Sequence, residues 1–258
     1  MSIVSTKEIF IDVDGGSIFI KKWLPENPQH TAPIVLIHDS LGCVDLWRDF
    51  PEQLARSLSC VVIAYDRLGF GRSSINNNRL DVNFVWEEAD FYSTHIKRAA
   101  EFSSYYLFGH SVGGGMSIGI AAIDKDCVGV ITESAQAFVE DKTIQGIKEA
   151  QVLFKRPEQR ARLEKWHGNK TNWVLNAWFD TWLSSEFSSW SIESRISQVT
   201  CPVLVLHGDK DEYGSNAFPE YIANNVSGES SMVIIENCGH VPHKEKMDEI
   251  INHIRLFL

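Results

Sequence analysis

Residues 107–115 read LFGHSVGGG, and they place one hydroxyl nucleophile, Ser111, between two glycines in the pattern G-x-S-x-G. An aromatic and apolar run at 105–108 precedes it, and small and apolar residues follow it at 116–123. This order predicts a strand, a sharp turn and a helix, in which the glycines let strand and helix approach closely. The chemistry it indicates is attack by a serine hydroxyl at the positive end of a helix.

A serine hydroxyl is a weak nucleophile and needs a base, usually a histidine that a carboxylate orients. The segments HGDKDEYG at 207–214 and NCGHVPHKE at 237–245 supply such groups, the acid before the base. Each segment follows a short apolar run of the kind that forms a buried strand. Because parallel strands end on the same edge of a sheet, we expect both loops to converge on Ser111.

Both loops contain two candidates. Asp211 and Asp209 compete as the acid, and His240 and His243 compete as the base. His240 directly follows Gly239 at the end of the strand, whereas His243 begins the next helix, so we prefer His240. If Asp211 is the acid, Asp209 is a turn-forming residue.

Other polar residues near these motifs are interpreted as structural. His110 is adjacent to Ser111, but neighbouring residues on a tight turn face different ways. Asp66 and Arg67 follow another apolar run, and we expect them to hold a turn. The remaining histidines have no partner that the sequence identifies.

A parallel sheet is needed to position these loops. Short apolar runs bounded by turn residues predict strands buried on both faces at 32–38, 60–66, 105–110, 127–133 and 202–208. The segment 231–240 supplies a last strand. Helical patterns lie at 46–58, 86–102, 112–123 and 247–258. The alternating segment 7–25 predicts a hairpin at the sheet edge. This order predicts an α/β fold class with a doubly wound, mostly parallel, eight-stranded sheet.

The segment 138–197 breaks this rhythm because it has no strand-like run. Five of the eight tryptophans fall within it, namely Trp166, Trp173, Trp178, Trp182 and Trp190. We predict a helical cap, or lid, at 138–197, inserted into a core domain made of 1–137 and 198–258. Its aromatic rings either form the core of the cap or wall an apolar acyl pocket.

Composition narrows the classes of function. A chain of 258 residues suits one α/β domain with an insertion, and a net charge of −10 disfavours general nucleic-acid binding. No apolar run approaches the roughly 20 residues that span a bilayer, and no secretory signal pattern is visible, so we expect no membrane partner. The five cysteines are scattered and never in C-x-x-C spacing, which predicts no metal site and a reducing, cytoplasmic location. We expect no cofactor.

Several motifs, in this order, resemble the α/β-hydrolase superfamily. They are HDSLGCVDLWRDFP and YDRLGFGRSS, Gly-His-Ser-Val-Gly at 109–113, Gly208-x-x-Asp211, and Gly239-His240 with Pro242 behind. The resemblance covers essentially the whole chain and implies an α/β-hydrolase fold with a helical cap. It implies Ser111 as nucleophile, Asp211 as acid and His240 as base, and its spacing selects Asp211 over Asp209.

An oxyanion hole needs two backbone N–H groups aimed at the developing charge. We expect one from Val112, the residue after the nucleophile. Members of the superfamily usually read His-Gly-x in the loop after the strand at 32–38, whereas this chain reads His38-Asp39-Ser40. The second donor is then Ser40, with Leu41 as the fallback. We expect Asp39 to point away, because an acid facing the oxyanion would be costly.

The resemblance implies a serine carboxylic-ester hydrolase, a carboxylesterase that acts through an acyl-enzyme. Because the cap segment is short, we expect short to medium acyl esters as substrates. Similar caps occur in thioesterases and in carbon–carbon bond hydrolases of aromatic degradation, which remain alternatives. A non-catalytic ligand-binding module is an alternative of another class, which the complete triad disfavours.

A basic stretch in the cap, KRPEQRARLEKWHGNK at 155–170, sets six positive residues against two glutamates, a local charge of +4. It is either a solvated helix face or a docking patch for an acidic partner. The patch resembles that of the pimeloyl-acyl-carrier-protein methyl ester esterases of biotin synthesis. This implies docking of acyl carrier protein by Arg156, Arg160, Arg162 and Lys165. Otherwise the substrate is a small-molecule ester.

Overall fold

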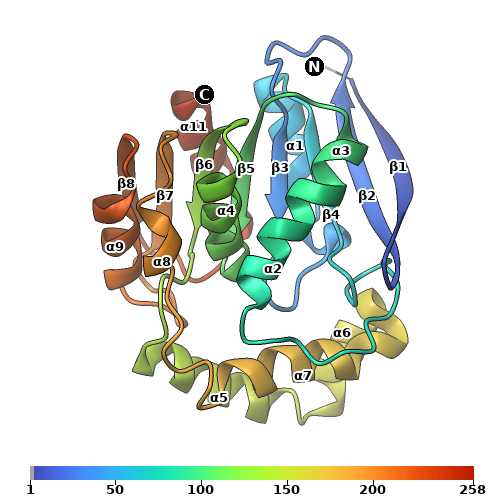
Figure 1. The fold of residues 1–258 in the computed structure, drawn as a ribbon, viewed down its shortest axis with the longest axis vertical. Coiled ribbons are helices and arrows are strands. Elements are labelled where there is room, and N and C mark those ends of the chain that lie inside the picture. Colours follow the sequence, from blue (N-terminus) through green and yellow to red (C-terminus); the bar gives the residue numbers. More distant parts are fainter. Residues whose placement is uncertain (1–2) are drawn as a thin grey trace.

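One twisted sheet runs through the computed structural model, which describes residues 3–258 (Figure 1). Its strand order is β1-β2-β4-β3-β5-β6-β7-β8. The strands are β1 (Val4–Val13), β2 (Gly16–Pro25), β3 (Ile34–Ile37), β4 (Val62–Tyr65), β5 (Tyr105–His110), β6 (Cys127–Glu133), β7 (Val203–Gly208) and β8 (Ser230–Ile235). The pairings β1–β2 and β2–β4 are antiparallel and the others are parallel. The predicted fold class is therefore confirmed.

The central strands are apolar because they are covered on both faces. Every residue of β3, β4 and β7 is buried. One apolar core contains residues of α2 and α4, such as Val85 and Met116, and the other contains residues of α1 and α11, such as Leu54 and Ile250. In Figure 1 the first group of helices lies in front of the sheet and the second behind it.

The helices of the sheet domain differ in detail from the predicted ones. They are η1 (Val44–Trp47), α1 (Phe50–Leu58), α2 (Phe84–Phe91), η2 (Tyr92–Ile96), α3 (Lys97–Ala100), α4 (Val112–Ile123), α8 (Glu193–Ile196), α9 (Ala217–Asn225), α10 (Pro242–Glu245) and α11 (Met247–Phe257). The predicted helix at 46–58 is divided, because Arg48 has a φ of 57° between η1 and α1. The predicted helix at 86–102 begins at Phe84 and contains the π-helical turn η2.

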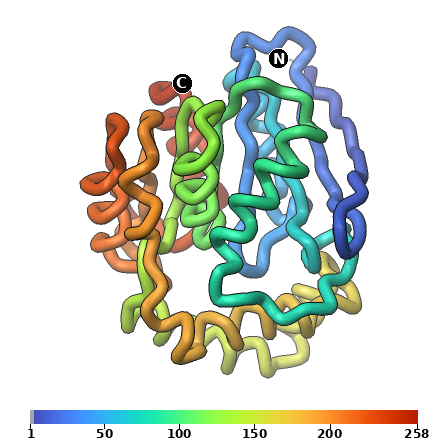
Figure 2. The backbone as a smooth tube through the Cα atoms, in the orientation of Figure 1, coloured from blue at the N-terminus to red at the C-terminus, as the bar shows by residue number. Residues whose placement is uncertain are grey.

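Three helices lie across one end of the sheet, at the bottom of Figure 1: α5 (Asp141–Leu153), α6 (Pro157–His167) and α7 (Thr171–Trp182). The chain enters and leaves this cap through a narrow neck, whose two limbs run side by side (Figure 2). Phe138 and Ser191 form an antiparallel bridge there. The last helix of the segment 138–197 that we assigned to the cap, α8, contacts α4 of the core.

Buried polar side chains, among them His167 and Lys170, tie the cap to loops of the core. His167 accepts a hydrogen bond from the Gly71 N–H at its Nδ1 (2.9 Å) and donates one from Nε2 to the Leu41 carbonyl (2.9 Å). Lys170 donates to the carbonyls of Phe70 (3.0 Å) and Gly71 (2.6 Å). The His167 ring must be neutral to accept at one nitrogen and donate at the other, and burial lowers its pKa.

Among residues 3–258, no helix combines the length and the apolar character that crossing a bilayer requires.

Candidate active site

Ser111 stands on a strained turn between β5 and α4. Its φ of 57° and ψ of −124° lie in a region that residues with a side chain rarely occupy. Glycine is required on both sides, because a Cβ on Gly109 would lie 2.2 Å from the Gly113 carbonyl oxygen, and one on Gly113 would lie 2.2 Å from that of Ile37. The turn places the Ser111 hydroxyl at the carboxyl edge of the sheet, at the N-terminus of α4.

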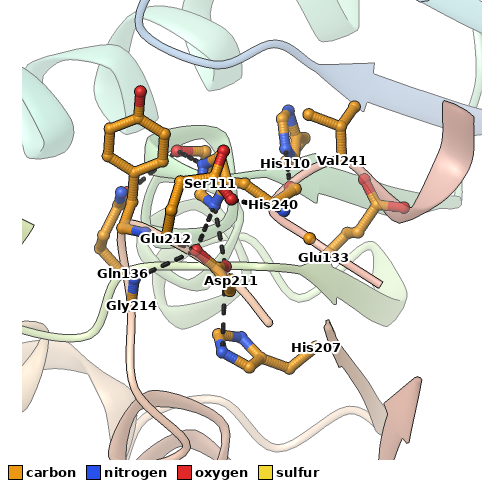
Figure 3. Close-up of polar contacts among 12 residues, drawn as sticks. His110, Ser111, Glu133, Gln136, His207, Asp211, Glu212, Gly214, His240 and Val241 are labelled. Atoms are coloured by element: carbon orange, nitrogen blue, oxygen red, sulfur yellow. Dashed lines mark hydrogen bonds and ion pairs between the residues drawn. The ribbon is translucent and has the colours of Figure 1, made fainter. Parts of the chain in front are cut away.

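The structure brings the three residues that we predicted as a triad into one hydrogen-bonded chain (Figure 3). The Ser111 Oγ lies 3.0 Å from the Nε2 of His240. The Nδ1 of His240 lies 2.9 Å and 2.8 Å from the two carboxylate oxygens of Asp211. These side chains come from the loops after β5, β8 and β7, whose strands end on the same edge of the sheet.

Asp211 is held as a carboxylate. Its Oδ1 also accepts the backbone N–H groups of Tyr213 (2.7 Å) and Gly214 (3.1 Å). Although burial opposes the charge, the interaction with His240 holds the pKa of Asp211 below its ordinary value. A carboxylate can only accept hydrogen bonds, so the Nδ1 of His240 carries the hydrogen and its Nε2 lone pair faces Ser111.

The competing candidates lie outside this chain. Asp209 is exposed, and its carboxylate accepts the Cys238 N–H (3.0 Å), which holds a turn. His243 is buried on α10, and its Nδ1 lies 2.5 Å from the Oε2 of Glu133. Neither side chain is hydrogen-bonded to the side chain of Ser111, His240 or Asp211.

The two expected oxyanion donors flank the nucleophile. Val112 is the first residue of α4, where backbone N–H groups have no partner within the helix. Ser40 lines the cavity that contains Ser111. The fallback donor, Leu41, is occupied, because its N–H donates to Asp39 Oδ1 at 2.7 Å. The geometry therefore favours Ser40 over Leu41.

Asp39 is one of the residues that line the cavity, and we had expected its side chain to point away from the oxyanion site. Its charge is taken up on both sides, because Oδ1 accepts the Leu41 N–H and Oδ2 lies 3.2 Å from the Nδ1 of His110. Burial opposes the charge, but the hydrogen bond from His110 and the positive charges of His110 and Lys244 hold the pKa of Asp39 well below its usual range. The acid is tolerated there because it is paired.

Asp66 and Arg67 shape the loop that carries Ser40. The Asp66 carboxylate accepts the N–H groups of Val44 and Arg72, both at 2.6 Å, and burial raises its pKa to about 6. Arg67 donates to the Asp39 carbonyl at 2.7 Å. These contacts join the loops after β3 and β4, which is the turn-holding role that we predicted for the pair.

A cavity of about 220 Å³ opens beside Ser111. The cap contributes Leu163 from α6 and Trp178 from α7 to its lining. The other cap tryptophans do not line it: Trp182 and Trp190, for example, pack against each other with ring centroids 5.7 Å apart. Both readings of the cap aromatics thus apply, each to different rings.

A polar residue next to the nucleophile was missed from the sequence. The Oε1 of Gln136 lies 3.2 Å from the Ser111 Oγ, and the side chain is buried. No motif points to Gln136. The only signal is its place in the loop after β6, a strand that ends on the same edge as the triad loops.

A metal ion could be considered at one buried group, where ligand atoms of His110, Glu133 and His243 lie within 4.8 Å of one another. However, the nitrogens of His110 face Asp39 and the carbonyl oxygen of His240, and His243 is hydrogen-bonded to Glu133. Protein contacts account for the arrangement, so we assign no metal to it.

The basic stretch of the cap divides in the structure. Arg156, Arg162 and Lys165 are exposed on or next to α6, and Arg160 is half-buried and donates to the Asn172 side chain. Lys170, which we had counted with them, is buried as a cap anchor and does not belong to the surface patch.

Comparisons with known proteins give the family. Residues 34–253 match the model of the Alpha/beta hydrolase family. Similar solved structures include a membrane phospholipase A described as a bacterial virulence factor (22% identity, 98% of this chain and 85% of that chain, TM-score 0.74). They also include a putative lipase from Acinetobacter baumannii AYE (18%, 98% and 90%, 0.75) and a serine hydrolase involved in carbazole degradation (20%, 98% and 98%, 0.73). No curated protein matches this chain.

At these identities the solved structures show the fold alone. The family model carries more, because it spans most of the chain and includes the loops of Ser40, Ser111, Asp211 and His240. The chain therefore belongs to the α/β hydrolase family, and this membership indicates a hydrolase.

Proposed function

We propose that the protein is a serine carboxylic-ester hydrolase that works through an acyl-enzyme. The observation that carries the proposal is the continuous hydrogen-bonded chain from Ser111 through His240 to Asp211, which opens onto a cavity. Such a chain activates a hydroxyl that would otherwise be a weak nucleophile.

The proposed reaction follows from the contacts. The Ser111 Oγ attacks the acyl carbonyl carbon while the Nε2 of His240 takes the hydroxyl proton, and Asp211 stabilises the imidazolium that forms. The N–H groups of Val112 and Ser40 bind the oxyanion. His240 then returns the proton to the departing alcohol. In the second half, water gives a proton to His240 as its oxygen attacks the acyl carbon. The bond from that carbon to Ser111 Oγ then breaks, His240 returns the proton to Oγ, and the acid is released.

The proposed substrates are short to medium acyl esters. The cavity of about 220 Å³ is smaller than the roughly 300–1,000 Å³ of typical ligand pockets. Leu46, Leu163 and Trp178 give it an apolar lining, and Gln136 gives it a polar contact next to the nucleophile. An apolar acyl chain of limited length fits this lining.

A finer proposal concerns an acyl-carrier-protein ester, of which the pimeloyl methyl ester of biotin synthesis is one example. It is supported by the position of Arg156, Arg162 and Lys165, which are exposed around the same helix whose Leu163 lines the cavity. An acidic carrier on these residues would sit beside the cavity. We also propose a reducing, cytoplasmic location, because all five cysteines are free.

The test replaces the nucleophile. Ser111→Ala should abolish hydrolysis of p-nitrophenyl butyrate and labelling by a fluorophosphonate probe, with the circular dichroism spectrum unchanged. Ser188→Ala is the matched control, because the same change is made at an exposed serine of the cap. Substantial turnover or labelling in Ser111→Ala would overturn the proposal. Wild-type protein that neither labels nor turns over any ester would favour the non-catalytic binding module.

A further inference from the structure

His110 has two hydrogen-bond partners that can only accept. The ring is buried, and its Nδ1 lies 3.2 Å from a carboxylate oxygen of Asp39. Its Nε2 lies 2.8 Å from the backbone carbonyl oxygen of His240 (Figure 3). A neutral imidazole carries one hydrogen and can donate to only one of these oxygens. Both contacts are satisfied together only when both ring nitrogens carry a hydrogen.

The proton could in principle lie on Asp39, but the surroundings favour the ring. The other oxygen of Asp39 accepts the Leu41 N–H, and Lys244 adds a positive charge nearby, so the carboxyl group is stabilised as an anion. On its other side His110 faces the Glu133 carboxyl group at the end of β6. A positive ring between these two groups is electrostatically compensated.

The remaining neighbours add no opposing charge. The ring of His243, on α10, lies 5.1 Å from the His110 ring, and burial lowers the pKa of His243, which keeps it neutral. The ring of His240 also lies 5.1 Å away, and Trp47 packs at 6.2 Å. Although burial opposes its charge, the hydrogen bond and charge of Asp39 raise the pKa of His110 above its ordinary value.

We infer that His110 is a positioning residue which, as a doubly protonated imidazolium, joins the oxyanion loop at Asp39 to the base loop at the carbonyl of His240. This rests on the proposed esterase function, since it concerns the geometry of the same site. The ring is fixed to the backbone of Ser111, its neighbour in the chain. One side chain therefore sets the positions of both loops relative to the nucleophile.

The inference explains the departure at Asp39. A glycine there would leave the Nδ1 of His110 without its acceptor. With aspartate, the residue next to the donor Ser40 is anchored to the residue next to Ser111. The arrangement holds below the pKa of the His110 ring and is lost as the pH rises through it, when one nitrogen loses its hydrogen.

The charge of His110 can be measured directly in the wild-type protein. In ¹⁵N-labelled protein, both ring nitrogens of His110 should give signals of protonated nitrogen at pH 7, above the ordinary histidine pKa of about 6.5. The ring signals are assigned by through-bond correlation to the backbone of His110 in the wild-type protein, so the assignment needs no variant. An unprotonated ring nitrogen at pH 7 would overturn the inference. This readout does not depend on catalysis, so it stands even if the esterase proposal fails.

Kinetics test the positioning role. In Asp39→Asn the amide keeps the shape of the side chain but not the charge that raises the pKa of His110. The fall of kcat/KM at alkaline pH should therefore begin at a lower pH than in the wild type. In His110→Gln the amide can still donate to the His240 carbonyl but does not titrate, so the fall of kcat/KM that His110 causes at alkaline pH should disappear. At pH 7 both should lose kcat by about a hundredfold or less, with KM within about twofold. Asp209→Asn, which neutralises an exposed aspartate of another loop, is the control.

A purely structural role for His110 predicts a different result. Both variants would then lose activity by the same factor at every pH, and the alkaline limb would stay where it is in the wild type. That outcome would refute the inference. Should the variants fail to fold, the ring signals of the wild-type protein decide the question on their own.

Discussion

The Asp211→Asn substitution removes the charge behind the proposed base and leaves its shape. In the wild type, the Nδ1 of His240 donates to a carboxylate that also accepts the N–H groups of Tyr213 and Gly214. An asparagine keeps one acceptor oxygen for these two backbone donors. Its amide nitrogen then faces His240 and donates to Nδ1, which moves the imidazole hydrogen to Nε2. In that form His240 cannot accept the proton of Ser111.

The size of the loss follows from two effects. A charge pair about 4 Å apart is worth about 4 kcal/mol at an effective dielectric constant near 20, so loss of the Asp211 charge alone raises the barrier enough for roughly a thousandfold in rate. The wrong tautomer adds to this, and the same change in other serine triads costs about 10⁴-fold in kcat. We expect kcat to fall by about 10³- to 10⁴-fold, with KM nearly unchanged.

The assay is steady-state hydrolysis of p-nitrophenyl butyrate, with thermal unfolding recorded for each variant. Asp209→Asn is the matched control, because it is the same chemical change two residues away on an exposed side chain. We expect Asp209→Asn to retain most of its activity, since its carboxylate only holds a turn at the Cys238 N–H. Equal losses in the two variants would refute the assignment of Asp211, and so would a well-folded Asp211→Asn enzyme with near wild-type kcat.

Three further predictions concern substrates and the cap. In a p-nitrophenyl ester series we expect the optimum at a short or medium acyl chain, because the cavity holds about 220 Å³, and an optimum at palmitate would contradict this. Reversing Arg156, Arg162 and Lys165 to glutamate together should slow hydrolysis of an acyl-carrier-protein ester by up to about a hundredfold, since exposed pairs contribute about 1 kcal/mol or less each. The loss of activity on the carrier-protein ester should become smaller as the salt concentration rises, and hydrolysis of a small ester should be unchanged. No loss at low salt would mean that the basic residues form only a solvated helix face. Finally, because the pKa of His167 is lowered in the folded protein, the unfolded chain binds a proton more readily than the folded one. The two hydrogen bonds of His167 to Gly71 and Leu41 therefore stabilise the fold at neutral pH, and this stabilisation is lost as the pH falls below about 6.5. Urea denaturation should show that wild type is more stable than His167→Gln at pH 7 and that the difference shrinks by pH 5; a constant difference would count against a titrating bridge.

The sheet could be predicted from the sequence because its signal is local. Continuous apolar runs bounded by turn residues identify buried strands, and the runs predicted at 32–38, 60–66, 105–110, 127–133 and 202–208 each contain the strand that the structure shows. The last strand is displaced, because β8 begins at Ser230 and ends at Ile235, whereas the prediction was 231–240. Helix interruptions were less predictable. Nothing in the apolar pattern of 46–58 shows that Arg48 adopts a positive φ, because the residue is exposed and takes no part in that pattern.

The site was predictable where function follows from position on a strand end. Ser111, Asp211 and His240 each follow a recognisable strand, so their meeting could be inferred from topology. The contacts of Gln136, His110 and Asp39 could not, because they depend on how side chains of distant loops are oriented. Lys170 shows the same limit, since burial of a lysine against backbone carbonyls leaves no mark in a charge count.

The neck of the cap separates the helices that line the substrate cavity from the strands that carry the triad. Because 138–191 leaves and rejoins the core at one bridge, Phe138 to Ser191, changes inside the cap can alter the cavity without moving the strands that carry the triad. Substitutions in the cap can therefore change the substrate preference while the triad geometry in the sheet domain is kept. The exceptions include His167, Lys170 and Thr143, whose side chains donate to carbonyls of the core loops. A cap transplanted from another member of the family would have to bring equivalent anchors with it.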